Sequence, residues 1–292
     1  MPTHFITGEE LSPAQLEALI ARAAELKAAP FESDALAKRT VALIFQKPST
    51  RTRVSFEAGI AELGGHAMVL HTGELQLSRG ESLRDTAYVL SRQVAAICVR
   101  EGADEFVTEL AQHAAIPVIN ALTANHHPCQ ALADLLTLRE EFGRLEGLTL
   151  AYVGDGNNVA RSLAVLGSTV GVSVRIASPR RYTLVDAPAG AQLTEDARAA
   201  VRGADAVYTD VWVSMSDDPD EAAERRRALE PYRLDDALLD LAAPHAIAFH
   251  CLPAHPGEEI SEEVLYGTRQ RIWTQAENRR HAQKALLEHL VR

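Results

Sequence analysis

Residues 41–53 read Val41-Ala-Leu-Ile-Phe45 followed by Gln46-Lys-Pro-Ser-Thr-Arg-Thr-Arg53. The apolar run predicts a short buried strand, and the polar stretch after it predicts a loop that leads into a helix. We expect this helix to end at Gly64-Gly65, because glycine is the usual residue just past a helix C-terminus. A buried strand that passes through a short loop into a helix is the repeating unit of an α/β protein.

The same alternation of strands and helices continues along the chain. Further strands are expected at 67–70, 95–99, 117–121, 148–153, 172–177, 206–210 and 246–250. Helices are expected at 83–92, 104–113, 128–141 and 276–291, with polar loops at 71–82 and after Ala177. The pattern predicts an α/β fold with two doubly wound parallel-sheet domains joined by interdomain helices. The expected boundaries are 1–134, 135–275 and a C-terminal helix, 276–292, that packs back on the first domain.

The composition of the 292-residue chain excludes several classes of protein. Its net charge is -11, the wrong sign for nucleic acid binding. Three cysteines without a CxxC pair make a disulfide framework a poor fit and favour a reducing cytoplasm. The N-terminal residues do not resemble a signal peptide, and no apolar stretch approaches the 18 or so residues that span a membrane.

A candidate anion site lies where the first strand unit turns into its helix. A helix start offers unpaired backbone N–H groups and a partial positive charge. Hydroxyl and guanidinium donors stand at the same place, on Ser49, Thr50, Arg51 and Thr52. Together they can cradle phosphate oxygens. From this stretch alone, an ordinary N-cap with solvated arginines remains an equal alternative.

A second candidate is the sequence His127-Pro128-Cys129-Gln130. Pro128 suits the first position of a helix, and His127 and Gln130, three residues apart, can share one face. Both side chains can donate to a carbonyl oxygen. A lone histidine here can equally be a cap or a packing residue.

The stretches GDGNN, DVWVSM and HCLP each follow a predicted strand of the second half. Ligands in open α/β sheets bind beyond the carboxyl ends of the strands, so these residues are expected to converge on one crevice. They are Asn157, Asn158, Asp210, Ser214, Met215, Cys251 and Leu252. A turn cap for Asp210 and an inert buried thiol for Cys251 are the structural alternatives.

Six motifs taken together resemble the aspartate/ornithine carbamoyltransferase family. In chain order they are STRTR (49–53), HPCQ (127–130), GDGNN (154–158), DVWVSM (210–215), HCLP (250–253) and AENR (276–279). The resemblance covers residues 5–291, and DVWVSM, HCLP and Lys47 are similar to the ornithine branch. It implies transfer of the carbamoyl group of carbamoyl phosphate to the side-chain amine of ornithine, a step of arginine metabolism. It implies no metal or organic cofactor.

The resemblance also implies a role for each motif residue. The first domain would bind carbamoyl phosphate through Ser49, Thr50, Arg51, Thr52, Gln76, Arg100, His127, Gln130 and Arg279. The second would bind ornithine through Asn158, Asp210, Ser214, Met215, Cys251 and the Leu252 backbone, with a cis Leu252-Pro253 peptide. The residues nearest the chemistry would be Arg100, His127, Asp210 and Cys251. The family's catalytic unit is a trimer, in which Gln76 would reach a neighbouring subunit's site.

Three features depart from the family pattern. Ser216 stands where the ornithine branch has glycine, Arg161 replaces a smaller polar residue, and the stretch between Ala177 and Asp210 is short. Two alternatives therefore stay open. One is a carbamoyltransferase for another amine (aspartate, putrescine or an N-acylated ornithine), and the other is a catalytically silent binding protein. A dinucleotide-dependent oxidoreductase is disfavoured, because the GxGxxG fingerprint is absent from the sequence.

Overall fold

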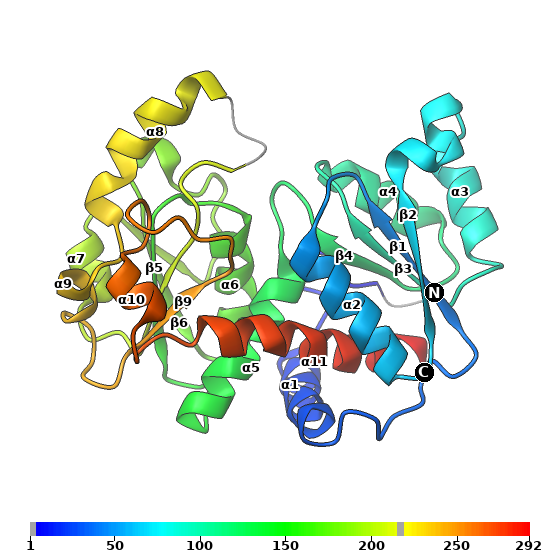
Figure 1. Ribbon diagram of the computed structural model, residues 1–292, viewed down its shortest axis with the longest axis horizontal. Coiled ribbons are helices and arrows are strands. Elements are labelled where there is room, and N and C mark those ends of the chain that lie inside the picture. Colours follow the sequence, from blue (N-terminus) through cyan, green and yellow to red (C-terminus); the bar gives the residue numbers. More distant parts are fainter. Residues whose placement is uncertain (1–3, 215–218) are drawn as a thin grey trace. The chain divides into compact units, whose positions relative to one another are not determined.

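The computed structural model describes residues 4–214 and 219–292 (Figure 1). The chain divides into two compact units. Unit 1 comprises residues 1–136 and 277–292, and unit 2 comprises residues 137–276. Both divisions fall inside helices, α5 (Pro128–Phe142) and α11 (Ile272–Val291), so the chain passes between the units as helix.

Unit 1 is built on a four-stranded sheet with the strand order β2-β1-β3-β4. Its strands are β1 (Thr40–Phe45), β2 (His66–His71), β3 (Ala96–Arg100) and β4 (Val118–Leu122). Its helices are α1 (Pro13–Ala28), α2 (Thr50–Glu62), α3 (Leu83–Leu90) and α4 (Asp104–His113), with the first part of α5 and the last part of α11. All three strand pairings are parallel, which confirms the predicted sheet type.

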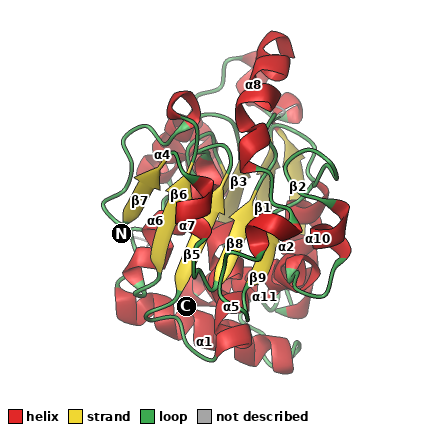
Figure 2. Cartoon of the chain, turned by 90° about the vertical axis from the view of Figure 1, so that its left-hand side faces the viewer, coloured by secondary structure: helices red, strands yellow, loops and turns green. Residues whose placement is uncertain are grey.

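Unit 2 is built on a five-stranded sheet with the order β7-β6-β5-β8-β9, again paired in parallel (Figure 2). Its strands are β5 (Thr149–Val153), β6 (Ser173–Ala177), β7 (Ala191–Thr194), β8 (Ala206–Thr209) and β9 (Ile247–His250). Its helices include α6 (Asn158–Thr169), α7 (Ala197–Val201), α8 (Ala222–Leu229), α9 (Asp236–Leu239) and α10 (Glu262–Tyr266). Two doubly wound α/β units of parallel strands therefore make up the described chain.

The sequence prediction missed one strand. β7 lies in the stretch expected to be a loop and pairs with β6 as an edge strand, with Val174 opposite Ala191. Its side chains are half-buried or exposed, so it lacks the apolar run that marks a buried strand. The expected loop at 71–82 contains two short 3-10 turns, η1 (Thr72–Glu74) and η2 (Gln76–Arg79).

Each sheet buries its faces under helices, which explains the apolar runs in its strands. In unit 1, Ala42, Ile44, Ile97 and Val99 lie in one buried cluster with side chains of α3 and α4. In unit 2, inward side chains of β5, β8 and β9 form a cluster with α7, α9 and α10. None of the helices formed by the described residues is long and apolar enough to cross a membrane.

The strand orders give each unit one point where the winding of the sheet reverses. In unit 1 the chain places β2 on one side of β1 and β3 on the other. In unit 2 it places β6 and β7 on one side of β5, and β8 and β9 on the other. Helices then leave in opposite directions, and the carboxyl ends of the two central strands open a crevice that binds ligands in this class of fold.

Candidate active site

In unit 1 the sheet reverses between β1 and β3, and α2 begins at Thr50, shortly after the carboxyl end of β1. Ser49 occupies the N-cap position but makes no capping hydrogen bond with its side chain. By contrast, Ser12 of α1 and Ser82 of α3 do cap their helices. The first N–H groups of α2 therefore lack the usual side-chain acceptor, which favours the anion-cradle interpretation over the ordinary cap.

Thr52 connects three separate parts of unit 1. Its hydroxyl oxygen accepts from Arg100 Nη1 at 3.0 Å and from Arg279 Nη2 at 2.9 Å. Arg279 Nη1 donates to Gln130 Oε1 at 3.1 Å, and Gln130 Nε2 donates to Asp134 at 3.0 Å. Residues from α2, β3, α5 and α11 thus form one buried or half-buried cluster.

His127 belongs to the same cationic environment. Its side chain is buried, and burial first, then the charges of Arg279, Arg100 and Arg51, hold its pKa well below the ordinary value. The imidazole is therefore neutral near pH 7 and can donate a single N–H to a carbonyl oxygen.

The turn that precedes His127 is fixed by Asp104. This carboxylate accepts hydrogen bonds from Thr123, Asn125 and His126. Burial acts to raise its pKa, but these hydrogen bonds outweigh burial and lower the pKa to about 2. Asp104 is therefore ionised at neutral pH and holds the start of α5 in place.

Gln76, another predicted residue of unit 1, stands apart from this cluster. It begins η2, and its side chain is exposed. Among the described residues, no hydrogen bond links that side chain to Thr52 or to its partners.

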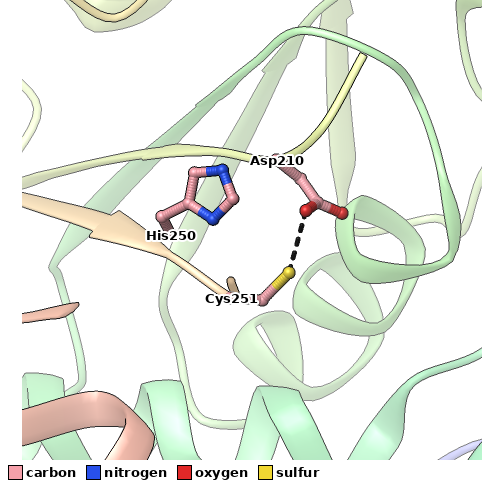
Figure 3. Close-up of side chains that lie close together, drawn as sticks. All are labelled: Asp210, His250 and Cys251. Carbon is pink, nitrogen blue, oxygen red and sulfur yellow. Dashed lines mark hydrogen bonds between the residues drawn. The ribbon is translucent and has the colours of Figure 1, made fainter. Parts of the chain in front are cut away.

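In unit 2 the sheet reverses between β5 and β8. Asn157 caps α6 by accepting from the backbone N–H groups of Val159 and Ala160. Its Nδ2 donates to Asp210 Oδ2 at 2.7 Å, across the reversal point of the sheet. The other oxygen of Asp210 accepts from the Cys251 thiol at 2.9 Å (Figure 3). Asp210 therefore joins the ends of three strands.

The ring nitrogens of His250 make hydrogen bonds with groups other than the Cys251 thiol. Its Nδ1 accepts from the Leu252 backbone N–H at 2.8 Å, and its Nε2 lies 3.2 Å from Glu259 Oε1. The peptide between Leu252 and Pro253 is cis, as expected, and Leu252 has a φ of 62°. The HCLP turn is thus held by its own first residue.

Asp210, His250 and Cys251 also offer ligand atoms within 4.8 Å of one another, a spacing that a metal ion can use (Figure 3). However, the thiol proton is donated to Asp210, and His250 Nδ1 already accepts a backbone N–H. The three side chains therefore fit a hydrogen-bonded network better than a metal centre.

The other predicted ornithine residues lie around this network. Asn158 is the first residue of α6 and is half-buried. Ser214 is exposed after β8. Met215, and Ser216 after it, lie outside the described residues.

Sequence reasoning missed a set of contacts, here called the Arg225–Asp155 brace, that supports the GDGNN loop. Arg225 of α8 donates to the Trp212 carbonyl oxygen at 3.0 Å, pairs with Asp155 at 2.8 Å and covers the Tyr182 ring. Only the folded chain brings these residues together, since Arg225 stands in an unremarkable charged run, Glu-Arg-Arg-Arg.

Arg161, an apparent departure from the family pattern, has a local role. Its guanidinium donates to the backbone carbonyl oxygens of Val185 and Asp186 in the shortened loop after β6. Gly156 packs against the same loop, since a Cβ there would lie 2.5 Å from the Leu184 nitrogen. The extra cation therefore secures the loop that supports GDGNN.

Two family models match consecutive parts of the chain. Residues 3–140 match the carbamoyl-P binding domain of aspartate/ornithine carbamoyltransferases, and residues 146–290 match the Asp/Orn binding domain. The chain belongs to the aspartate/ornithine carbamoyltransferase family. Its two sheet reversal points therefore fall in the two domains that define this family.

Similar members of the family share most of their length with the chain. An ornithine carbamoyltransferase of Acidothermus cellulolyticus is 49% identical over 304 aligned residues, which cover 100% of this chain and 97% of that protein. The crystal structure of ornithine carbamoyltransferase from Thermus thermophilus superposes with a TM-score of 0.92 at 41% identity, with 100% of both chains covered. The ornithine carbamoyltransferase from Pyrococcus furiosus gives 0.93 at 42% identity, covering 98% of this chain and 96% of that one.

Proposed function

We propose that this protein is an enzyme that transfers the carbamoyl group of carbamoyl phosphate to the side-chain amine of L-ornithine, giving L-citrulline and phosphate. The observation that carries the proposal is the Thr52 cluster, in which two arginines and a neutral histidine surround an uncapped helix start. The second unit supplies the Asn157–Asp210–Cys251 network. Relatives at 47–49% identity carry the name ornithine carbamoyltransferase.

Unit 1, which includes residues 277–292, binds carbamoyl phosphate in this proposal. The phosphate lies at the start of α2, where Ser49, Thr50, Arg51 and Thr52 donate to its oxygens. The Thr52 oxygen already accepts two guanidinium N–H groups, so its own proton is the part left to donate to the ligand. Arg100, His127, Gln130 and Arg279 hold the carbamoyl group.

The chemical step moves charge toward these donors. As the amine attacks the carbamoyl carbon, the carbonyl oxygen gains negative charge, and Arg100, His127 and Thr52 stabilise it. The neutral imidazole offers one ring N–H to this oxygen. The C–O bond between the carbamoyl carbon and the phosphate then breaks, and the attacking nitrogen gives up one proton to the leaving phosphate. The phosphate keeps its charge-assisted hydrogen bonds at the helix start.

Unit 2 binds ornithine and accepts its amine in the neutral form. An alkyl amine titrates near pKa 10, so deprotonating it near pH 7 costs roughly 4–5 kcal/mol. Asp210, Cys251 and the Leu252 carbonyl oxygen are the acceptors proposed for the amines of ornithine, with Asn158, Ser214 and Met215 at its α-carbon end.

The acceptor amine is the point at which family members differ. An aspartate site needs additional cations for the second carboxylate, and Arg161 is the obvious candidate in the sequence. Both terminal nitrogens of Arg161 already donate to loop carbonyls, so its hydrogen-bonding groups are engaged away from a second carboxylate. The acidic Asp210 of the same unit also favours a substrate with a side-chain amine over one with a second carboxylate.

The direct test measures product formation from carbamoyl phosphate with ornithine, aspartate, putrescine and acetylornithine in parallel. Citrulline formation with ornithine as the strongly preferred acceptor is expected. Turnover with another amine would keep the carbamoyl phosphate assignment and overturn the acceptor. Binding of carbamoyl phosphate without turnover of any amine would identify a silent binding protein instead.

The active assembly in this proposal is a homotrimer in which Gln76 completes the site of a neighbouring copy. Its exposed position on η2 supports this role. Mixing Gln76→Ala and Arg51→Ala chains, each inactive alone, should restore activity at roughly one quarter of the sites in random trimers. Hybrids without activity, or a monomeric wild-type protein by light scattering, would contradict the shared site.

The proposed compartment is the cytoplasm. All three cysteines are buried free thiols, which suits a reducing environment.

A further inference from the structure

The HCLP turn contains a buried acid–histidine pair that the proposed reaction does not use directly. His250 and Glu259 are both completely buried, and Glu259 stands nine residues later, after the turn. A buried carboxylate needs partners that satisfy its oxygens. The hydrogen bonds of this pair show which parts of the backbone it fixes.

The tautomer of His250 follows from its neighbours. The Leu252 backbone N–H can only donate, so His250 Nδ1, 2.8 Å away, must be the acceptor. Nε2 then carries the ring proton and donates it to Glu259 Oε1 at 3.2 Å. Glu259 Oε1 also accepts the His255 backbone N–H at 2.5 Å.

These bonds fix backbone at both ends of the turn. Leu252 has a φ of 62°, in the left-handed region that residues with a Cβ rarely adopt. The bond to His250 holds the Leu252 peptide in that conformation, and the bond from His255 anchors the segment after Pro253. The direction of the Leu252 carbonyl is therefore set by side chains rather than by the sheet ladder.

We infer that His250 and Glu259 are positioning residues, which orient the Leu252 carbonyl oxygen as the acceptor for the reacting amine. This inference rests on the proposed function. Cys251 donates to Asp210 and not to His250, so the histidine acts through the backbone of the turn.

Two substitutions of His250 separate this role from simple packing. Asparagine places an oxygen close to the position of Nδ1 and can still accept the Leu252 N–H. Glutamine reaches toward Glu259 but leaves no acceptor at the Nδ1 position. In the full-length enzyme, His250→Gln should lower kcat/KM for ornithine at least about tenfold, whereas His250→Asn should stay within about threefold of wild type.

The readouts include the carbamoyl phosphate dissociation constant, which should change less than about twofold in both variants. His245→Gln is the matched control. This histidine pairs with Asp205 at 2.7 Å, before the amino end of the same strand, β9. It should leave the ornithine dependence unchanged even if the melting temperature falls.

Equal losses in His250→Gln and His250→Asn, or wild-type kcat/KM in His250→Gln, would overturn the inference. If His250→Gln does not fold, Glu259→Met decides, because it removes the acceptor of both the His250 ring and the His255 N–H. A loss of at least about fivefold for ornithine alone supports the inference, and a wild-type value overturns it. A wild-type chain that makes no citrulline would overturn the proposed function and this inference together.

Discussion

At the scale of single residues, Thr52 shows how one hydroxyl can organise a charged site. Two guanidinium groups donate to its oxygen, one from β3 and one from α11. Each arginine is thereby fixed before any ligand arrives, which lowers the entropy that binding must overcome. Arg51 and Arg53 flank Thr52 on α2. Arg51 is half-buried whereas Arg53 is exposed, so the two arginines can be compared in one experiment.

Arg51→Ala should weaken carbamoyl phosphate binding by about 3 kcal/mol, roughly a hundredfold, if two charge-assisted hydrogen bonds are lost. Arg53→Ala is the control on the same helix, because Arg53 is exposed and its Nε donates to Glu57 at 2.8 Å. Calorimetric titration with carbamoyl phosphate measures both variants. Near-normal affinity in Arg51→Ala would remove the phosphate-cradle assignment.

Cys251→Ala removes the thiol donor to Asp210 and should lower kcat/KM for ornithine roughly tenfold, with carbamoyl phosphate binding unchanged. Steady-state kinetics with ornithine as the varied substrate gives the value. Cys98→Ala, a buried thiol in β3, should lower stability without changing the ornithine dependence. An ornithine dependence equal to wild type in Cys251→Ala would show that this thiol is only a packing residue.

At the scale of secondary-structure elements, the last helix is secured to unit 1 by a buried lysine. Lys284 Nζ donates to the carbonyl oxygens of Leu26 and Pro30 and lies 2.5 Å from Glu62. These contacts tie α11 to α1, to α2 and to the loop that follows α1 (Figure 1). Since Arg279 lies on the same helix, this anchor also holds one of the two guanidiniums at Thr52.

Lys284→Met should reduce the free energy of unfolding by about 3–5 kcal/mol, because it leaves buried acceptors without their cation. Arg292→Ala, at the residue just after the end of this helix, is the control. Its side chain is 69% exposed in the pair with Glu288, so its loss should cost less than about 1 kcal/mol. Urea denaturation measures both variants. A loss below about 1 kcal/mol in Lys284→Met would mean that other groups satisfy these acceptors.

At the scale of the whole molecule, an acidic chain holds a strongly cationic site. The net charge is -11, yet Arg51, Arg100 and Arg279 all act on His127. A local field depends on which groups surround a point and how well water screens them, so the total charge does not predict it. Burial and nearby cations also change how the free energy of unfolding depends on pH.

Two buried histidines of unit 1 should make the protein less stable as the pH falls below 6.5. Burial, with nearby cations, lowers the pKa of His127 well below its ordinary value, and burial, then Lys284 and Arg280, lowers that of His281 to about 4. Below pH 6.5 the unfolded chain binds these protons and the folded chain does not. Each histidine should therefore remove at most about 1.4 kcal/mol of stability per pH unit.

Denaturation midpoints between pH 7 and pH 5 measure this slope. His281→Gln should flatten it, and His289→Gln, which changes an exposed side chain on the same helix, should not. Carboxylates with lowered pKa values, such as Asp104 and Glu259, lose their contribution only at lower pH, below the ordinary carboxyl range. Identical slopes in wild type and His281→Gln would exclude His281 as a source of the pH dependence.

The sequence by itself determined the fold class, the parallel sheets, most element positions and the family. Apolar runs such as Val41–Phe45 mark buried strands because both faces of a parallel sheet are covered, and local motifs such as GDGNN keep their spacing along the chain. The short edge strand β7 carried no such signal, since its side chains are largely solvent-facing.

Only the tertiary structure decided which side chains meet. The Arg279–Thr52 bond joins residues 227 positions apart, and the Arg225–Asp155 brace and the His250–Glu259 pair likewise depend on how loops close. Periodicity reports whether a side chain faces the core or the solvent. A hydrogen bond between distant residues depends instead on chain reversals that no local pattern records.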